Sequence, residues 1–131
     1  MLRAFSITDI GKRRKLNQDY VFVSIAPIGN LPNVFIVADG MGGHNAGDYA
    51  SKYTVEMIEE QIRESERTVA ADILKDAIEK ANSYIRSMAR GDSALTGMGT
   101  TVVAASVKGT ILQVANVGDS RLYIVNQNEI R

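Results

Sequence analysis

The sequence predicts an α+β domain, with strands within residues 3–39 and 98–131 and two helices within 44–90. The outer regions are rich in β-branched and aromatic residues, whereas the middle region carries apolar residues at steps of three and four. Strands grouped apart from helices are typical of α+β proteins. The chain has 131 residues, of which 45% are hydrophobic and 23% charged, and this is enough for a single domain with a real core.

The first strands are expected to form a hairpin. Residues 3–8 alternate apolar and polar side chains, which predicts a half-buried strand. Residues 19–26 predict a second strand, and the segment 27–32 (PIGNLP) has the composition of a turn. Residues 33–38 return as a strand that is apolar on both faces, so we expect it to be central in its sheet.

Two amphipathic helices are expected next. The first begins at Ala46 and ends in the charged segment 63–67. The second begins after Thr68, a candidate N-cap, and ends at Arg90, with Gly91 as its C-cap. We expect both apolar stripes to face the core.

The last third returns to strands. We expect strands over 99–107 and 110–117 joined by a tight turn at Lys108-Gly109, and a further strand over 121–125. One more strand begins at 129–131, where the sequence stops. Domains seldom end one step into a strand, so we expect a partial domain.

Composition narrows the class of function. Fifteen basic residues balance fifteen acidic ones, which argues against nucleic acid or a membrane surface as the main partner. The chain has no cysteine, which excludes disulfides, thiolate metal sites and a cysteine nucleophile. No apolar run has the length of a membrane span, and the N-terminus lacks a signal-peptide core, so we expect a cytoplasmic protein.

The single histidine, His44, limits metal chemistry. One histidine is enough for a Ser-His-Asp triad, but it excludes a zinc site built from several histidines of this chain. Any bound metal must therefore take mostly oxygen ligands, which favours Mg²⁺ or Mn²⁺.

Three aspartates stand at the ends of predicted strands. Asp19 opens the second strand, Asp39 closes the third, and Asp119 follows the strand that ends at residue 117. Antiparallel neighbours lie about 5 Å apart, so Asp19 and Asp39 could share a site if a cation or a proton separates them. The alternative is that Asp39-Gly40 is only a turn and Asp19 only a strand-edge cap.

Two loops near these aspartates are ambiguous by themselves. The segment 40–47 (GMGGHNAG) lacks the pattern of a phosphate-binding P-loop or a dinucleotide fingerprint, and can be a simple strand-to-helix joint. The run 12–15 (KRRK) is either a solvated turn or the source of one arginine that clamps a phosphate. A nuclear-localisation or nucleic-acid role is a weak interpretation for a neutral chain.

Together these segments resemble the metal-dependent protein phosphatases of the 2C type, in their bacterial serine/threonine form. The resemblance rests on four groups of motifs in order: TDIG at 8–11 with RKLNQD at 14–19, VADGMGGH at 37–44, MGTT at 98–101, and VANVGDSR at 114–121. It implies an α-β-β-α sandwich of two antiparallel sheets flanked by helices. It also implies that this chain covers about the first half of that fold.

The resemblance implies a role for each site residue. Asp39 is expected to bridge two catalytic Mn²⁺ or Mg²⁺ ions, with the Gly40 carbonyl as a further ligand and Asp19 as the partner carboxylate. Asp119 is expected to reach a third, weaker ion. Arg14 is expected to hold the substrate phosphate, so that Arg14, Asp19 and Asp39 form the catalytic group.

The implied reaction is hydrolysis of phosphoserine and phosphothreonine in proteins by metal-activated water, without a phosphoenzyme. Some family members carry a histidine directly after the Asp-Gly pair, but Met41 stands there, so the leaving group must be protonated by water or another group. His44, three residues on, is assigned to loop packing. The further metal-binding aspartates of the family's second half have no counterpart here, so we expect weak metal occupancy and little turnover from this chain.

Alternatives and partners follow from the same motifs. The second hypothesis is a non-catalytic phosphoprotein-binding or structural fragment of the same fold. An aspartyl-phosphate hydrolase needs an aspartate two residues after Asp39, where Met41 stands, and is set aside. The expected partners are phosphoproteins, a cognate serine/threonine kinase, and a second copy of the chain bound through exposed sheet edges. No nucleic acid or membrane partner is expected.

Overall fold

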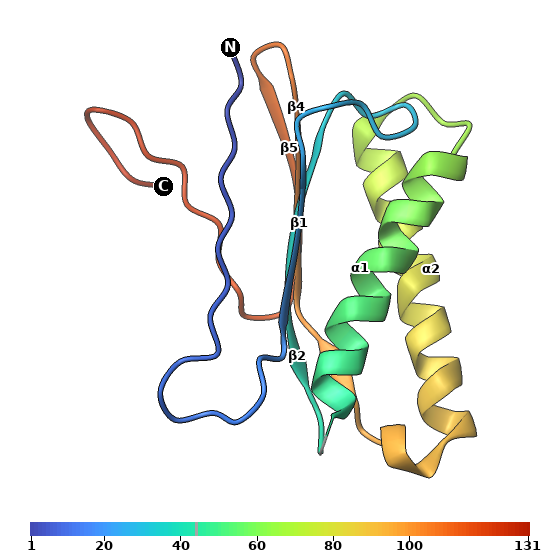
Figure 1. Cartoon of the computed structure of the whole chain (residues 1–131). Coiled ribbons are helices and arrows are strands. Elements are labelled where there is room, and N and C mark those ends of the chain that lie inside the picture. Colours follow the sequence, from blue (N-terminus) through green and yellow to red (C-terminus); the bar gives the residue numbers. More distant parts are fainter. Residues whose placement is uncertain (44) are drawn as a thin grey trace.

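A single sheet covered on one face by two helices makes up the computed structural model, which describes residues 1–43 and 45–131. The sheet has five strands: β1 (Asp19–Ser24), β2 (Val34–Met41), β3 (Gly99–Thr100), β4 (Val102–Lys108) and β5 (Ile111–Val117). The helices are α1 (Ala46–Glu64) and α2 (Ala70–Gly91), followed by the short 3₁₀ helix η1 (Ser93–Leu95). Figure 1 shows both helices on the same side of the sheet.

The sheet is antiparallel, with the order β1-β2-β4-β5, and β3 pairs with the end of β2. β2 is therefore central, as its two apolar faces predict. A two-residue turn joins β4 to β5, but it consists of Gly109 and Thr110, one residue later than expected, because Lys108 still pairs with Ile111. Ile28 and Leu31 bridge each other inside the loop that joins β1 to β2. The helical positions also agree with the expected stripes, so the α+β class is confirmed.

The core lies between the helices and one face of the sheet. Burial alternates along β2, and Ile36 (1% exposed) packs with Ile58 and Ile62 of α1 (both 0%). Complete burial of such a side chain stabilises a fold by about 1.5–3 kcal/mol. A smaller cluster, which includes Ala50 and Met98, packs at the end of the sheet where β2 finishes. This second cluster supports the strand end that carries Asp39.

Asn33, directly before β2, extends the sheet with its side chain. It is 5% exposed, and its Nδ2 donates to the carbonyl of Val107 at 2.8 Å while its Oδ1 accepts from the N–H of Val107 at 2.7 Å. The amide side chain thus copies the two hydrogen bonds of a main-chain pair, and so holds β4 against the start of β2.

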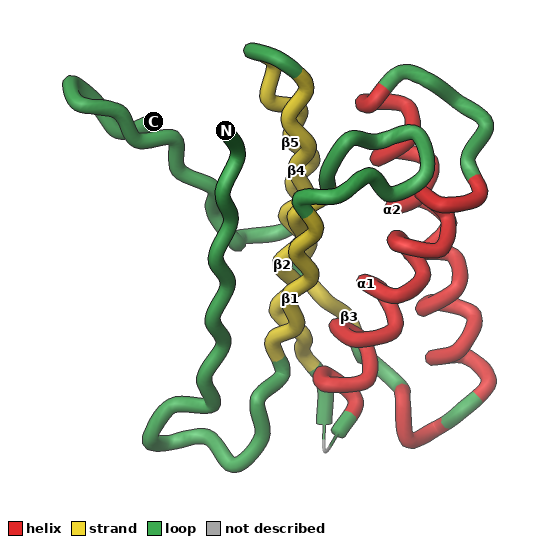
Figure 2. Tube along the Cα trace, turned by 45° about the horizontal axis from the view of Figure 1, so that its top comes forward, coloured by secondary structure: helices red, strands yellow, loops and turns green. Residues whose placement is uncertain are grey.

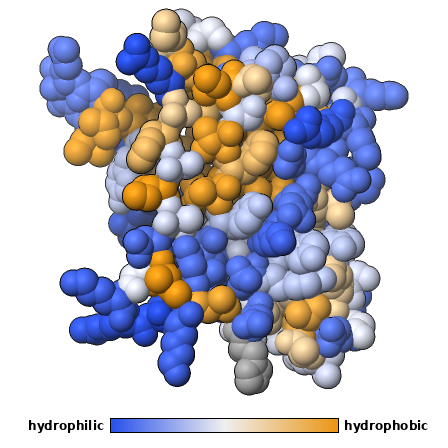
Figure 3. All heavy atoms as spheres, viewed as in Figure 1, coloured by the Kyte–Doolittle hydropathy of each residue, from blue (hydrophilic) through white to orange (hydrophobic). Residues whose placement is uncertain are grey.

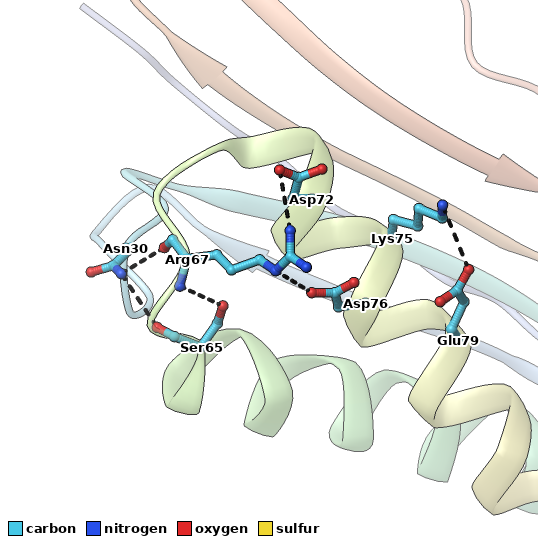
Figure 4. A network of polar contacts seen from close by, with 7 residues as sticks. All are labelled: Asn30, Ser65, Arg67, Asp72, Lys75, Asp76 and Glu79. Atoms are coloured by element: carbon cyan, nitrogen blue, oxygen red, sulfur yellow. Dashed lines mark hydrogen bonds and ion pairs between the residues drawn. The ribbon is translucent and has the colours of Figure 1, made fainter.

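The loop between the helices is held by polar contacts (Figure 4). Arg67 forms ion pairs with Asp72 at 3.3 Å and Asp76 at 2.8 Å, and its carbonyl accepts from Asn30 Nδ2 at 2.7 Å. The loop between β1 and β2 is thereby attached to the loop between α1 and α2. Exposed ion pairs add little stability individually, so we regard this network as fixing the loop's path.

The structure corrects several local expectations. Residues 3–8 form no strand, and 121–125 contribute only the bridge from Val125 to Ile130. Both segments lie on the side of the sheet opposite the helices (Figure 2). A period-2 pattern specifies which face of a strand is apolar but supplies no partner, and without a partner the main chain forms no ladder. The second sheet that the resemblance implies is not formed by the described residues.

The ends of α2 also differ from the expectation. The N-cap is Val69 rather than Thr68, and its side chain makes no capping bond in the described part of the chain. Gly91 is the last helical residue and Asp92 is the C-cap, in an extended conformation. The side chain of Asp92 accepts from the N–H of Ala94 and begins η1, so the chain leaves α2 without a glycine C-cap.

One face of the sheet remains open. The chain exposes 8887 Å², whereas a compact monomer of 14.3 kDa exposes about 6,800 Å². Large apolar side chains contribute to the excess, among them Phe5 (87% exposed), Val37 (48%) and Tyr123 (59%). Apolar side chains crowd the upper middle of the surface in Figure 3.

Neither long helix of the described chain has an apolar stretch that could cross a membrane.

Candidate metal and phosphate site

The two aspartates at the end of the sheet face each other. β1 begins at Asp19, and the ladder between β1 and β2 pairs this residue directly with Asp39. Asp39 is exposed and follows Ala38, which is completely buried against the helical layer. The alternation of β2 therefore directs Asp39 to the face turned away from α1 and α2. The juxtaposition expected from the strand ends is present, and both carboxylates border the open face.

Asp39 and Arg14 have opposite effects on the pKa of the Asp19 carboxyl. Partial burial raises the pKa of the Asp19 carboxyl, and a hydrogen bond with Asp39 and the negative charge of Asp39 raise it further. Arg14 is close enough to act in the opposite direction and lowers the pKa of Asp19. Two neighbouring carboxylates form a site where a proton or a cation between them is favourable. Hard carboxylate oxygens are also the ligands that Mg²⁺ and Mn²⁺ prefer, so the donor set fits a divalent ion.

Arg14 differs from its cationic neighbours. It lies in the exposed loop before β1, which Figure 1 shows at the lower left, and hydrophilic side chains project from that region in Figure 3. Of the four cations at 12–15, Arg14 is the one whose charge contributes to the pKa of Asp19 in the described structure. A guanidinium beside a pair of carboxylates can bind a phosphate that the metal also contacts.

Asn17 anchors the start of β1. Its Oδ1 accepts from the N–H of Asp19 at 3.0 Å, and its Nδ2 donates to Thr8 Oγ1 at 2.8 Å. The bond to Asp19 fixes the main chain where the carboxylate leaves it. The bond to Thr8 attaches the N-terminal segment to the same point, although that segment forms no strand.

The glycines after Asp39 allow a close approach of two elements. A Cβ on Gly40 would lie 1.8 Å from the carbonyl oxygen of Gly47, and a Cβ on Gly47 would lie 2.5 Å from Gln18 Nε2. The N–H of Gly40 donates to the carbonyl of Gln18 at 2.9 Å. Glycine is therefore needed at Gly40, where the end of β2 packs against main-chain atoms of the first turn of α1, whereas the close contact of Gly47 is with the end of a flexible side chain. The segment 40–47 is therefore more than a simple strand-to-helix joint at Gly40, where close main-chain packing requires a glycine.

Asp119 lies apart from the pair. It is exposed, in the loop after β5, and the described residues include no group of three or more Asp, Glu, His or Cys side chains placed to hold a metal ion. The neighbouring Ser120 connects to the site, because its Oγ lies 2.6 Å from Thr101 Oγ1, and Thr101 Oγ1 accepts from the N–H of Asp39 at 3.2 Å.

Thr101, Ser120 and Asn17 were not singled out from the sequence. All three lie inside the motif segments that carry the family resemblance, and this position is the feature of the sequence that could have indicated them. Met41 is 64% exposed at the end of β2 and has no acidic proton to donate. His44 lies outside the described residues.

Comparison with known proteins identifies the family. The model of the family "Protein phosphatase 2C" matches residues 19–131. Among curated proteins, the serine/threonine phosphatase stp of Listeria welshimeri is 39% identical over 128 residues, which cover 95% of this chain and 50% of that protein. The chain thus spans about half the length of the curated relatives it matches.

Solved structures agree with this result. The serine/threonine phosphatase Stp1 from Staphylococcus aureus superimposes with a TM-score of 0.83 at 32% identity, over 95% of this chain and 50% of that one. The catalytic domain of the phosphatase PstP, solved with two manganese ions, superimposes with a TM-score of 0.79 at 30% identity, over 93% of this chain and 50% of that one. The chain therefore belongs to the protein phosphatase 2C family.

Proposed function

We propose that the chain carries part of the catalytic site of a metal-dependent protein phosphatase that hydrolyses phosphoserine and phosphothreonine. The observation that carries the proposal is the direct pairing of Asp19 with Asp39 at one end of the sheet, with Arg14 acting on the same charges. The names of the relatives support this class of substrate. We assign residues 1–131 to one partial phosphatase domain.

Two Mn²⁺ or Mg²⁺ ions are the proposed cofactor. Asp19, Asp39 and the Gly40 carbonyl would hold them, and Asp119 would contribute to a third ion. When bound, the metal supplies Lewis acidity towards water and the phosphoryl oxygens. The described residues place only two carboxylates together, and the affinity for hard cations rises with the number and charge of ligands. We therefore expect weak binding.

Each site residue of this chain has a separate role in the proposed reaction. The Arg14 guanidinium binds two phosphoryl oxygens and orients the phosphate at the end of the sheet. Asp39 and Asp19 provide fixed negative charge on the open face, at a position set by the sheet and by Asn17. The exposed thioether of Met41 carries no acidic proton, so the leaving alkoxide takes its proton from solvent.

A non-catalytic module that binds phosphoproteins is the second candidate. The absence of a three-carboxylate group among the described residues favours it, because such a module needs Arg14 but no complete metal site. In either case the proposed partners are phosphorylated proteins and a serine/threonine kinase that phosphorylates them. The cytoplasmic location remains a prediction from the sequence.

Hydrolysis of an aryl phosphate, with and without Mn²⁺, separates the two candidates. Metal-dependent turnover that Asp39→Asn abolishes would support the phosphatase. Turnover absent at saturating Mn²⁺ would contradict a catalytic role for this chain and favour the binding module. For Arg14→Ala we expect a KM at least about tenfold higher, while Arg13→Ala, which removes the adjacent exposed cation, stays close to wild type. Equal effects of both variants would contradict the assignment of Arg14.

Self-association is a further part of the proposal. The excess exposure of this chain over a compact monomer is about 2,000 Å², which is more than the area of about 800 Å² that each partner buries in a standard protein interface. β1 and β5 are the two edges of the sheet, and both are available for pairing with another strand. Light scattering at concentrations above about 100 μM, where weak complexes of this area form, should therefore detect dimers. A monomer at all concentrations would refute this part.

A further inference from the structure

The ladder between β2 and the strands β3 and β4 is altered at one position. Gly40 pairs with Thr100 and Val37 with Val103, so Thr101, between β3 and β4, lies opposite Asp39. The N–H of Thr101 donates to the carbonyl of Asp39 at 2.9 Å, as in an ordinary ladder.

The return bond is different. A hydrogen-bonded antiparallel pair normally exchanges two main-chain bonds, but here the N–H of Asp39 donates to Thr101 Oγ1 at 3.2 Å. The carbonyl of Thr101 accepts instead from the hydroxyl of Thr100 at 2.8 Å. A side-chain hydroxyl therefore replaces the main-chain acceptor at the residue that carries the proposed metal ligand.

The same hydroxyl has a second partner. Thr101 Oγ1 lies 2.6 Å from Ser120 Oγ, and since it accepts from Asp39, its own proton is free to be donated to Ser120. The carbonyl of Ser120 accepts in turn from Asn116 Nδ2 at 3.0 Å. Gly118 has a φ of +97°, and a Cβ there would lie 2.8 Å from Thr101 Cγ2. The turn that includes Asp119 is therefore folded directly onto Thr101.

We propose that Thr101 is a positioning residue for the metal site. Its hydroxyl fixes the main chain at Asp39 and attaches the turn at 118–120 to the same point. The position of Asp119 relative to Asp39 is thereby held constant. The inference rests on the proposed function, which assigns both aspartates to metal binding. Partners that orient metal ligands typically change metal affinity by about 10- to 100-fold when they are removed.

Three variants of the 131-residue chain test this role. Thr101→Val keeps the shape of the side chain and removes the hydroxyl, while Thr101→Ser keeps the hydroxyl. Thr54→Val is the matched control, because Thr54 is 5% exposed and its hydroxyl has no hydrogen-bond partner in the described part of the chain. Each variant is measured by amide hydrogen exchange in EDTA, followed residue by residue by NMR, and by calorimetric titration with Mn²⁺.

For Thr101→Val, we expect the Asp39 amide to exchange about tenfold faster relative to the other β2 amides, which corresponds to about 1.4 kcal/mol. We also expect Mn²⁺ binding to weaken about tenfold. Thr101→Ser and Thr54→Val should remain close to wild type in both measurements. If Thr101→Val does not fold, Ser120→Ala tests the link from the other side: weaker Mn²⁺ binding supports the inference, and unchanged binding overturns it.

The outcomes separate the inference from the proposed function. Unchanged exchange at Asp39 in Thr101→Val would overturn the inference, as would faster exchange with unchanged Mn²⁺ affinity, since the hydroxyl would then be purely structural. Asp39→Asn is titrated in parallel. If it also leaves Mn²⁺ affinity unchanged, the proposed metal site itself is wrong; if it abolishes binding while Thr101→Val does not weaken it, only the role of Thr101 fails.

Discussion

Replacing Asp39 by asparagine should stabilise the metal-free chain at neutral pH. Asp39→Asn preserves the shape of the side chain and removes one of two carboxylates that are paired across neighbouring strands. Two unit charges about 5 Å apart repel by about 0.8 kcal/mol in a water-like dielectric. Asp19 and Asp39 are both exposed, so solvent and salt keep the repulsion at this low end, and we expect a gain of about 0.5–1 kcal/mol in the free energy of unfolding.

The gain should depend on pH in a definite direction. The pKa of Asp19 is raised above 3.8 in the folded state, first by partial burial and then by Asp39. The folded chain therefore binds a proton more readily than the unfolded chain, and its stability falls as pH rises from 3.8 through the folded-state pKa. In Asp39→Asn the part of this shift due to Asp39 is lost, so the stability advantage of the variant is present at pH 7 and disappears as pH falls towards 3.8.

Urea denaturation in EDTA between pH 4 and pH 8 measures this difference. Glu60→Gln is the matched control, since Glu60 is exposed on α1 and is in no ion pair among the described residues. Addition of Mn²⁺ should stabilise the wild type and leave Asp39→Asn unchanged, which reverses their order. If Asp39→Asn is no more stable than the wild type at pH 7 in EDTA, the two carboxylates do not repel, and the argument for a cation between them fails.

Two further predictions concern the framework of the site. Gly40→Ala places a Cβ 1.8 Å from the carbonyl oxygen of Gly47, so we expect a loss of at least about 2 kcal/mol in urea unfolding. Gly91→Ala, with open space around the new Cβ, should instead be neutral or slightly stabilising. Asn33→Ala removes both bonds to Val107 and leaves the N–H and carbonyl of this half-buried residue unpaired, which should cost about 2–4 kcal/mol. A loss below about 1 kcal/mol would show that water replaces these bonds.

The pairing of Asp19 with Asp39 could be predicted because it depends on local information. Asp19 opens one strand and Asp39 closes the next, so the two residues come to the same end of an antiparallel pair, and the apolar pattern of both strands limits the possible registers. The motif that singles out Arg14 from its cationic run agrees with the effect of Arg14 on the pKa of Asp19. These features required no knowledge of distant contacts.

The role of Thr101 could not be predicted in the same way. Its hydroxyl matters because the carbonyl of Thr101 accepts a hydrogen bond from the Thr100 hydroxyl and not from the N–H of Asp39. This arrangement exists only after β3 and β4 have paired with β2. The prediction of a strand at residues 3–8 was wrong because it used only the local pattern. Their alternation describes a surface that would suit a sheet, but a strand exists only where a neighbour offers the matching hydrogen bonds.

The open face of the sheet has a consequence for the thermodynamics of unfolding. Globular proteins gain about 12–15 cal/mol/K of heat capacity per residue when they unfold, mostly because buried apolar surface becomes hydrated, which for 131 residues would be about 1.6–2.0 kcal/mol/K. In this chain, side chains such as Val37 and Tyr123 are already hydrated before unfolding. The isolated chain should therefore have a smaller heat-capacity increment on unfolding, and its free energy of unfolding should change less steeply with temperature. A partner that covers the open face will increase both the heat-capacity increment and this temperature dependence.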